Sequence, residues 1–156
     1  MKLSGILLIV NTLLLIVIWG CTGIKYAGLP HIIPSHFDFY GKVDGESEKA
    51  MIWILPCIAA FISLLFFGIS RNPNSPLVNV PRSFRNKEKL ELYMFSLQLP
   101  VMLLFLDIIV ESVRIAEGKQ TELSSAIFFI LALMFAVIGV GLVKSIQEGI
   151  IEKSDD

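Results

Sequence analysis

Residues 3–24 read LSGILLIVNTLLLIVIWGCTGI and contain no Asp, Glu, Lys or Arg. A helix that crosses the roughly 30 Å hydrocarbon core of a bilayer needs about 20 mostly apolar residues. This stretch meets that requirement. The sequence therefore predicts a membrane-spanning helix near its beginning.

A lipoprotein signal peptide is an alternative interpretation of this first segment, because Cys21 follows an apolar run. Trp19, two positions before the cysteine, is a poor fit for the small residues of a processing site. We therefore interpret the segment as an uncleaved first helix.

Three further stretches have the same character, at residues 50–70, 92–110 and 123–143, and only the second contains a charged residue, Asp107. Backbone amides in hydrocarbon must be hydrogen-bonded within their own segment, and these stretches are far longer than the strands of a membrane barrel. We therefore expect an all-α integral membrane protein, with a single membrane domain over residues 1–156. The four transmembrane helices are expected at about residues 3–23, 50–70, 92–113 and 123–145.

The composition supports this class. Apolar residues make up 54% of the chain and charged residues 17%, against about 25% charged residues in soluble domains. The mean hydropathy is +0.73, and the net charge of −1 does not indicate a nucleic-acid partner. The two cysteines provide neither a disulfide framework nor a zinc-ligand spacing. The expected surroundings are the lipid bilayer, with no cofactor, no metal and no nucleic acid.

The positions of Lys and Arg predict the orientation, because cytoplasmic loops carry an excess of these residues. If the N-terminus is cytoplasmic, eight Lys and Arg residues lie inside and five outside. Most of the inside residues belong to a basic loop at 71–91. We therefore expect both termini to be cytoplasmic and the loop at 25–49 to be exterior.

The residues of this exterior loop indicate a built structure rather than a slack connector. Pro30 and Pro34 exclude a continuing helix, and Gly41 and the Asp44-Gly45 pair are typical of turns. Aromatic side chains stand between the prolines and the turn residues. We predict a small strand or hairpin that lies on the headgroup layer.

The same loop resembles the signature of a bacterial membrane family, the domain of unknown function 1648. The resemblance rests on the spacing of Leu29-Pro30, Ile33-Pro34, His36-Phe37, Gly41, Asp44 and Lys49. The stretch VNVPR at 78–82 is also similar to an Asn-x-Pro segment that follows the second helix in many members. The domain occurs alone and in SdpI-type immunity proteins, which protect a cell from its own secreted peptide toxin. The resemblance implies a multi-pass protein of the bacterial cytoplasmic membrane and, as its most concrete function, resistance to a membrane-active peptide.

Three roles are open to His36. It can ligate a metal together with the loop acids, act as a pH-sensitive switch, or pack under Phe37 and hydrogen-bond the backbone near Pro34. We favour the packing role, because no helical or cysteine spacing fixes a metal geometry. By the same reasoning, Asp44 is expected to accept backbone amides in a turn, and Lys49 to mark the start of the second helix.

Asp107 is the acid within a predicted span, where a carboxylate is costly unless it is paired, neutral or near water. Asp107, Glu111 and Arg114 share one helical stripe, in which Glu111 and Arg114 can form an i,i+3 pair. We predict an outer polar cluster in which Asp107 or Glu111 meets the exterior loop through Lys49 or His36. The alternative is that Asp107 lies about one turn below the headgroups and is hydrated.

Two packing contacts are also expected. Asn11 and Gln98 lie at comparable depths in the first and third spans, which favours an interhelical hydrogen bond between them. Ala132, Ala136 and Gly139 form a small-residue face in the last span, which favours the close approach of another helix.

The sequence contains no nucleophile elbow, P-loop, zinc-protease motif or dinucleotide fingerprint, so an enzyme is not expected. We expect a non-enzymatic protein that binds a secreted peptide toxin, a lipid headgroup or another membrane protein through its exterior loop. The binding residues expected in this loop and at the outer end of the third helix are Pro34, His36, Phe37, Gly41, Asp44, Lys49, Asp107 and Glu111. Two alternatives stay open. One is a subunit of a small oligomeric transporter or the membrane partner of a signalling regulator. The other is a metal-dependent membrane enzyme built on His36, Asp38 and Asp44.

Overall fold

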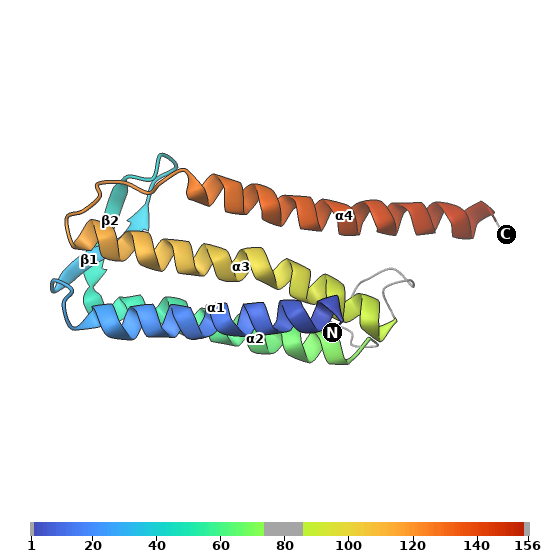
Figure 1. Ribbon diagram of the computed structural model, residues 1–156. Coiled ribbons are helices and arrows are strands. Elements are labelled where there is room, and N and C mark those ends of the chain that lie inside the picture. Colours follow the sequence, from blue (N-terminus) through green and yellow to red (C-terminus); the bar gives the residue numbers. More distant parts are fainter. Residues whose placement is uncertain (1, 74–85, 155–156) are drawn as a thin grey trace.

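The computed structural model describes residues 2–73 and 86–154, so the VNVPR stretch at 78–82 lies outside the described residues. The described chain forms four long helices, a short 3-10 helix and a hairpin of two strands (Figure 1). In chain order the elements are α1 (Leu3–Tyr26), β1 (Ile32–Phe37), β2 (Val43–Glu48), η1 (Lys49–Trp53), α2 (Ile54–Arg71), α3 (Lys87–Ala116) and α4 (Ala126–Ser154).

Four helices of the described chain are long and apolar enough to cross a membrane. They are α1, η1 together with α2, α3, and the part of α4 that ends at Lys144. Their outer surfaces carry many exposed Ile, Leu, Val and Phe side chains, far more than the surface of a soluble protein tolerates. The prediction of a mostly helical, multi-pass membrane protein is confirmed, and a small sheet lies where the sequence predicts a hairpin.

α3 is the central helix, because it packs against α1, α2 and α4, whereas α4 packs mainly against α3. One buried apolar cluster joins the first three helices and contains Ile18, Ala59, Met102 and Ile109. A second cluster lies beneath the hairpin and contains Leu29, Ile33, Ile52 and Val113. The hairpin is therefore packed onto the helices and is not a free loop.

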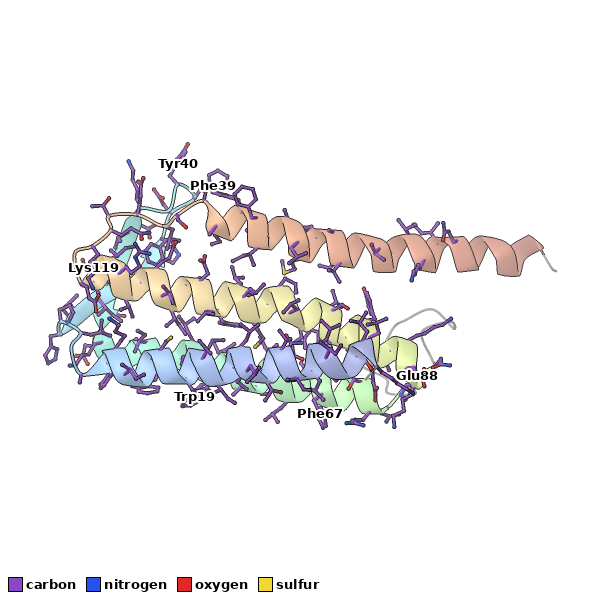
Figure 2. The ribbon with its side chains drawn as sticks, viewed as in Figure 1. Trp19, Phe39, Tyr40, Phe67, Glu88 and Lys119 are labelled. Carbon is purple, nitrogen blue, oxygen red and sulfur yellow. The ribbon has the colours of Figure 1, made fainter. Side chains whose placement is uncertain are left out.

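The two ends of the bundle differ in their elements. The hairpin end comprises β1, β2 and residues 117–125, which connect α3 to α4, and the loop end comprises the start of α1, the end of α2 and the start of α3 (Figure 1). The start of α1 and the end of α4 both lie away from the hairpin (Figure 1). Figure 2 shows Phe39 and Tyr40 at the tip of the hairpin, and Trp19 and Phe67 on the outer side of the bundle.

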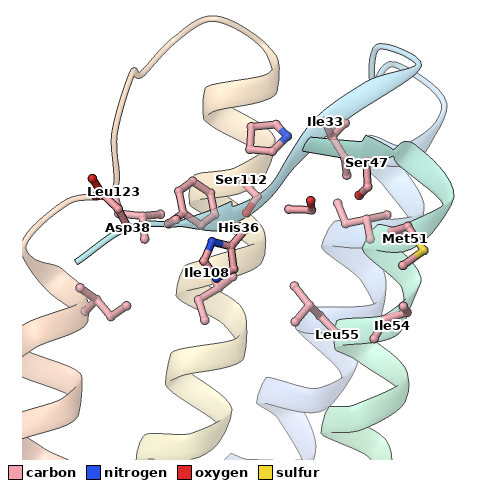
Figure 3. A pocket seen from close by; sticks show the side chains of 15 residues that line it. Ile33, His36, Asp38, Ser47, Met51, Ile54, Leu55, Ile108, Ser112 and Leu123 are labelled. Carbon is pink, nitrogen blue, oxygen red and sulfur yellow. The ribbon is translucent and has the colours of Figure 1, made fainter. Parts of the chain in front are cut away.

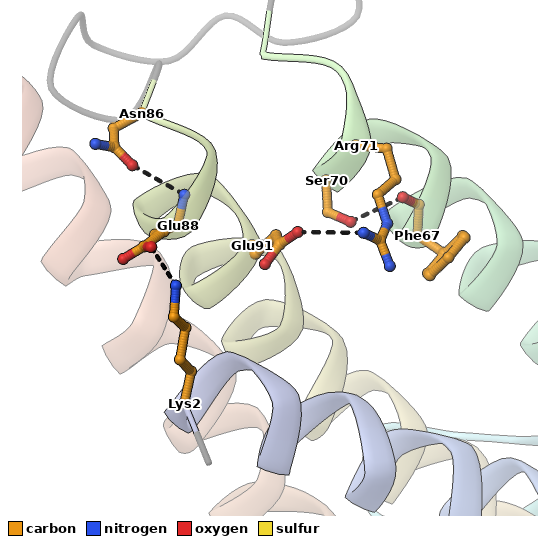
Figure 4. A network of polar contacts seen from close by, with 7 residues as sticks. All are labelled: Lys2, Phe67, Ser70, Arg71, Asn86, Glu88 and Glu91. Carbon is orange, nitrogen blue, oxygen red and sulfur yellow. Dashed lines mark hydrogen bonds and ion pairs between the residues drawn. The ribbon is translucent and has the colours of Figure 1, made fainter.

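α3 begins several residues before its apolar run, because its first turn is capped and paired. The Asn86 side chain accepts a hydrogen bond from the backbone N–H of Glu88 at 2.9 Å. The Glu88 carboxylate forms an ion pair with Lys2, and Arg71 lies 3.6 Å from the carboxylate of Glu91 (Figure 4). Ion pairs at the protein surface thus join three helices at the loop end.

The predicted hydrogen bond between Asn11 and Gln98 is wrong. The side-chain amide of Asn11 donates to the carbonyl oxygen of Phe95 at 3.0 Å, and that of Gln98 donates to the hydroxyl oxygen of Ser63 at 3.0 Å. Each amide reaches a different neighbouring helix. Both polar side chains still link helices within the apolar core, as such residues do in membrane proteins.

The predicted small-residue contact of α4 is also wrong. Ala132 and Ala136 are exposed, and nothing lies within 4 Å of a Cβ built on Gly139. α4 instead approaches α3 at Gly141, where the Tyr93 hydroxyl occupies the space that a Cβ would fill. The missing side chain of Gly141 therefore leaves room for Tyr93 at this contact between the two helices.

Candidate functional site

The hairpin closes through a turn built on Asp38 and Gly41. The Asp38 carboxylate accepts hydrogen bonds from the backbone N–H groups of Tyr40 at 2.8 Å and Lys42 at 2.9 Å. Gly41 has a φ of +81°, which a residue with a side chain rarely adopts. The prediction for Gly41 is confirmed, whereas the predicted turn role of Asp44 is wrong, because Asp44 lies within β2 and Asp38 closes the turn.

His36 pairs with Asp44 across the hairpin. The strand register places His36 opposite Gly45, and His36 Nδ1 lies 2.5 Å from a carboxylate oxygen of Asp44. A Cβ on Gly45 would lie 2.9 Å from the Cβ of His36, so the missing side chain allows this approach. The predicted packing of His36 under Phe37 is wrong, because a carboxylate holds the ring and its side chain is 74% exposed.

The residues considered for a metal enzyme belong to two separate interactions. Asp38 accepts backbone N–H groups in the turn, and Asp44 holds His36 between the strands. In residues 2–73 and 86–154, no group of three or more His, Cys, Asp or Glu side chains is placed to hold a metal ion.

The base of the hairpin is fixed by Lys49, the first residue of η1. Its backbone N–H donates to the carbonyl oxygen of His31 at 2.9 Å. Its ammonium group lies 3.4 Å from the carbonyl oxygen of Leu29 and 5.1 Å from the ring centre of Tyr26. Lys49 therefore marks the start of the second span, as predicted, and joins it to the end of the first.

The tip of the hairpin is tied to the connection between α3 and α4. The backbone N–H of Leu123 donates to the carbonyl oxygen of Gly41 at 2.8 Å. The next N–H along the chain, that of Ser124, donates to the Glu111 carboxylate at 2.7 Å. Glu111 is only 6% exposed, so a buried acid of α3 supports the hairpin through two adjacent residues.

The predicted outer polar cluster is therefore wrong in its partners. The Glu111 carboxylate accepts a hydrogen bond from the backbone N–H of Ser124, in the connection between α3 and α4, and within the described chain it makes no contact with Lys49 or His36 of the exterior loop. Asp107 is half-buried, and no hydrogen bond or ion pair joins its carboxylate to another residue that the structure describes. The predicted pair between Glu111 and Arg114 is absent from the described contacts, because Ser124 engages the Glu111 carboxylate.

A pocket of about 450 Å³ lies beneath the hairpin (Figure 3). β1 covers it, η1 and the start of α2 form one wall, and α3 with the start of α4 forms the other. The apolar lining consists of Ile33, Pro34, Phe37, Met51, Ile52, Ile54, Leu55, Ile108, Leu123 and Ile127. The polar lining residues are Ser35, His36, Asp38, Ser47 and Ser112. A cavity of this size with apolar walls and a few polar groups is typical of a ligand site.

One polar group of the pocket lacks a partner. The Ser47 hydroxyl is buried and forms no hydrogen bond with any residue that the structure describes. Buried hydroxyl groups are nearly always hydrogen-bonded, because an unpaired one loses its bonds to water without replacement. The hydroxyl is therefore a group that a polar atom of a ligand can satisfy.

A comparison with known protein families finds a match that includes the hairpin. Residues 13–60 match the family described as domain of unknown function (DUF1648). The match runs from the middle of α1 through the hairpin into α2, and it confirms the family suggested by the loop motif. No curated protein and no solved structure matches the chain.

The structure brings together only part of the predicted set. Pro34, His36 and Phe37 line the pocket, and Gly41 and Asp44 fix the hairpin above it. The sequence reasoning missed the lining residues of the helices, among them Ile108, Ser112 and Ile127. The spacing of Ile108 and Ser112 places both on one helix face, but only the docked hairpin turns that face into a wall.

Proposed function

We propose that this protein is a non-enzymatic receptor of the bacterial cytoplasmic membrane that binds a secreted, membrane-active peptide at its hairpin end. Binding would withdraw the peptide from the bilayer, so that the protein confers immunity or resistance. The pocket beneath the hairpin carries this proposal, because it is large, mainly apolar and bordered by hydrogen-bonding groups. The SdpI-type immunity proteins that share the domain give further support.

The chemistry of the pocket suits an amphipathic peptide. Such peptides lie at the membrane surface with apolar side chains directed inward and polar groups directed outward. An apolar side chain can enter between Leu55 and Ile108, while polar atoms of the peptide meet the Ser47 hydroxyl and the exposed His36. Phe39 is 82% exposed at the hairpin tip and offers an additional surface for a peptide that arrives at the interface.

The orientation in this proposal follows from the distribution of Lys and Arg. The loop at 71–91 holds five of them, and cytoplasmic loops are enriched in these residues. With that loop and both termini in the cytoplasm, the hairpin end faces the exterior, where a secreted peptide arrives. With this orientation the pocket lies near the outer surface of the membrane, which is where amphipathic peptides bind.

The absence of enzymatic activity is likewise part of the proposal. The acids near the pocket already serve structural roles, since Asp38 holds the turn, Asp44 holds His36 and Glu111 holds the connection to α4. Residues used in this way position a binding surface rather than a reacting group.

A survival assay tests the proposal. Sensitive bacteria that express the chain are exposed to the secreted peptide fraction of the source bacterium, and the concentration that kills half of the cells is measured. We expect the protein to raise this concentration and Phe37→Ala, which removes a pocket wall, to abolish the increase. Phe39→Ala removes an aromatic ring from the same hairpin outside the pocket and is expected to retain most of the protection.

Two results would contradict the proposal. One is equal survival of cells with and without the protein. The other is equal protection by the Phe37→Ala and unsubstituted proteins. Expression level and thermal unfolding in detergent are measured for both variants, so that a folding defect is distinguished from a loss of binding.

A further inference from the structure

A second pocket, of about 310 Å³, lies on a different face of the hairpin end. It is formed where the last turns of α1 and α3 meet, away from the strands. Its floor is apolar and contains Ile109, Val110 and Val113 of α3 together with Cys21 of α1. Ile109 and Val113 are buried beneath the pocket, so Val110, which is 37% exposed, and the partly buried Cys21 form the apolar surface that an acyl chain can contact.

The mouth of this pocket carries a cluster of charges. Lys25, Arg114, Glu117 and Lys119 surround it, which leaves a net charge of two positive. Glu117 binds both lysines, with its carboxylate oxygens 2.9 Å from the ammonium group of Lys25 and 2.5 Å from that of Lys119. The hydrogen bond from Lys119 lowers the pKa of the Glu117 carboxyl group most, and the hydrogen bond from Lys25 lowers it further. The carboxyl group is therefore ionised at neutral pH.

The backbone holds Lys119 in this position. Gly118 has a φ of +70°, and the N–H of Lys119 donates to the carbonyl oxygen of Arg114 at 2.9 Å. The chain therefore turns back over the end of α3 and brings the lysine beside the arginine. Arg114 is exposed, and no described residue forms an ion pair or hydrogen bond with its guanidinium group.

From this geometry we propose that the second pocket binds one anionic glycerophospholipid. The phosphate lies among Lys25, Arg114 and Lys119, and one acyl chain lies along the pocket against Val110 and Cys21. Lys and Arg side chains near the ends of spanning helices extend to the level of the lipid headgroups, so the phosphate can meet these cations while the acyl chain stays in the bilayer. The guanidinium group supplies planar, two-point recognition of phosphate oxygens.

The charge of the pocket selects among lipids. A zwitterionic choline lipid carries its own cation next to the phosphate, which leaves the excess positive charge of the pocket uncompensated. An anionic lipid such as phosphatidylglycerol compensates part of it. This inference does not depend on the peptide proposal, since the two pockets share no lining residue.

The test measures lipid retention by native mass spectrometry of the full chain, purified in detergent with equal amounts of phosphatidylglycerol and phosphatidylcholine. We expect one molecule of phosphatidylglycerol to be retained preferentially. Arg114→Gln should reduce the retention of phosphatidylglycerol about fivefold, the usual contribution of one cation near the membrane surface. Arg114→Lys should restore part of this retention. Lys42→Gln removes an exposed cation from the hairpin turn at the same end of the bundle, outside the pocket, and should leave retention unchanged.

Several outcomes would overturn the inference. They are equal retention of the two lipids, equal retention by the Arg114→Gln and unsubstituted proteins, and an equal loss in Lys42→Gln, which would indicate diffuse attraction. Displacement of the lipid by glycerol 3-phosphate at the same concentration would also overturn it, because a headgroup without a chain should bind much more weakly. Thermal unfolding of each variant in detergent excludes a folding defect, and Arg114 is an exposed side chain whose removal should not unfold the bundle.

Discussion

The hairpin end and the loop end of the bundle use polar residues in different ways. At the loop end, the described ion pairs join helix termini at the protein surface, as between Arg71 and Glu91 (Figure 4). At the hairpin end, Asp38, Asp44 and Glu111 each hold a backbone or side-chain group in a fixed place, and Asp38 also lines the cavity that Figure 3 shows. The comparison indicates that the polar residues of the loop end mainly connect helices, whereas those of the hairpin end fix the conformation of a surface.

Among the substitutions that test this comparison, loss of the Glu111 carboxylate should lower the stability of the protein most. Glu111→Ala leaves the Ser124 N–H without its partner and releases the segment that holds the hairpin turn. We expect the free energy of unfolding to fall by about 1.5–3 kcal/mol, the usual contribution of a hydrogen bond to a charged group. Chemical unfolding in detergent measures this free energy for the variant and for the unsubstituted protein.

The matched control is Glu122→Ala, which removes an exposed acid from the same connection. Its effect should stay within about 0.5 kcal/mol, as for most surface substitutions. If the two variants were equally stable, the buried carboxylate would not support the hairpin.

The next effect concerns the contact between the strands. Gly45→Ala places a Cβ 2.9 Å from the Cβ of His36, so the strands must separate or the imidazole must move. Overpacking of this kind costs about 1–3 kcal/mol. The free energy of unfolding and the NMR signals of the His36 ring should both change.

Gly20→Ala is the control, because nothing lies within 4 Å of the added Cβ. This variant should be neutral or slightly stabilising, since alanine favours a helix more than glycine does. An unchanged His36 signal in Gly45→Ala would show that the hairpin adapts without strain.

The loop end should respond much less. Arg71→Gln removes one surface ion pair, and such pairs contribute about 0–1 kcal/mol. The effect should shrink further at high salt, since exposed charges are screened. A loss larger than that of Glu111→Ala would reverse the comparison between the two ends.

The smallest expected effect is the pH dependence of the charge cluster at Glu117. Hydrogen bonds from Lys119 and Lys25 lower its pKa below the ordinary value of 4.5, so the unfolded chain binds a proton more readily than the folded chain. The stabilisation is therefore fully present above pH 4.5 and is lost as the pH falls through the folded pKa.

Melting temperatures measured between pH 3 and pH 6 should therefore fall more steeply towards low pH in the unsubstituted protein than in Glu117→Gln. Identical pH profiles would exclude a lowered pKa for this group.

The features of the fold that depend on local chemistry could be predicted from the sequence. Uninterrupted apolar runs predict the four spans, and the prolines with Gly41 predict the hairpin. The choice between Asp38 and Asp44 as the turn acid could not be predicted, because both residues are aspartates, which favour turns, and only the strand register decides between the two positions.

The partner of Glu111 was also beyond sequence analysis. Its contact with Ser124 depends on how the connection to α4 folds back over α3, and a helical stripe does not contain that information. The expectation that Lys49 would neutralise an acid was wrong for a related reason, because its ammonium group is held by Leu29 and Tyr26.

Filling the pocket beneath the hairpin tests the proposed site most directly. Ile127→Trp inserts bulk into that cavity, whereas Phe129→Trp adds an indole two residues along the same helix, at a site that is 75% exposed. In the survival assay with the secreted peptide fraction, we expect Ile127→Trp to lose protection and Phe129→Trp to retain it, at equal expression. Full protection by Ile127→Trp would contradict a binding site beneath the hairpin.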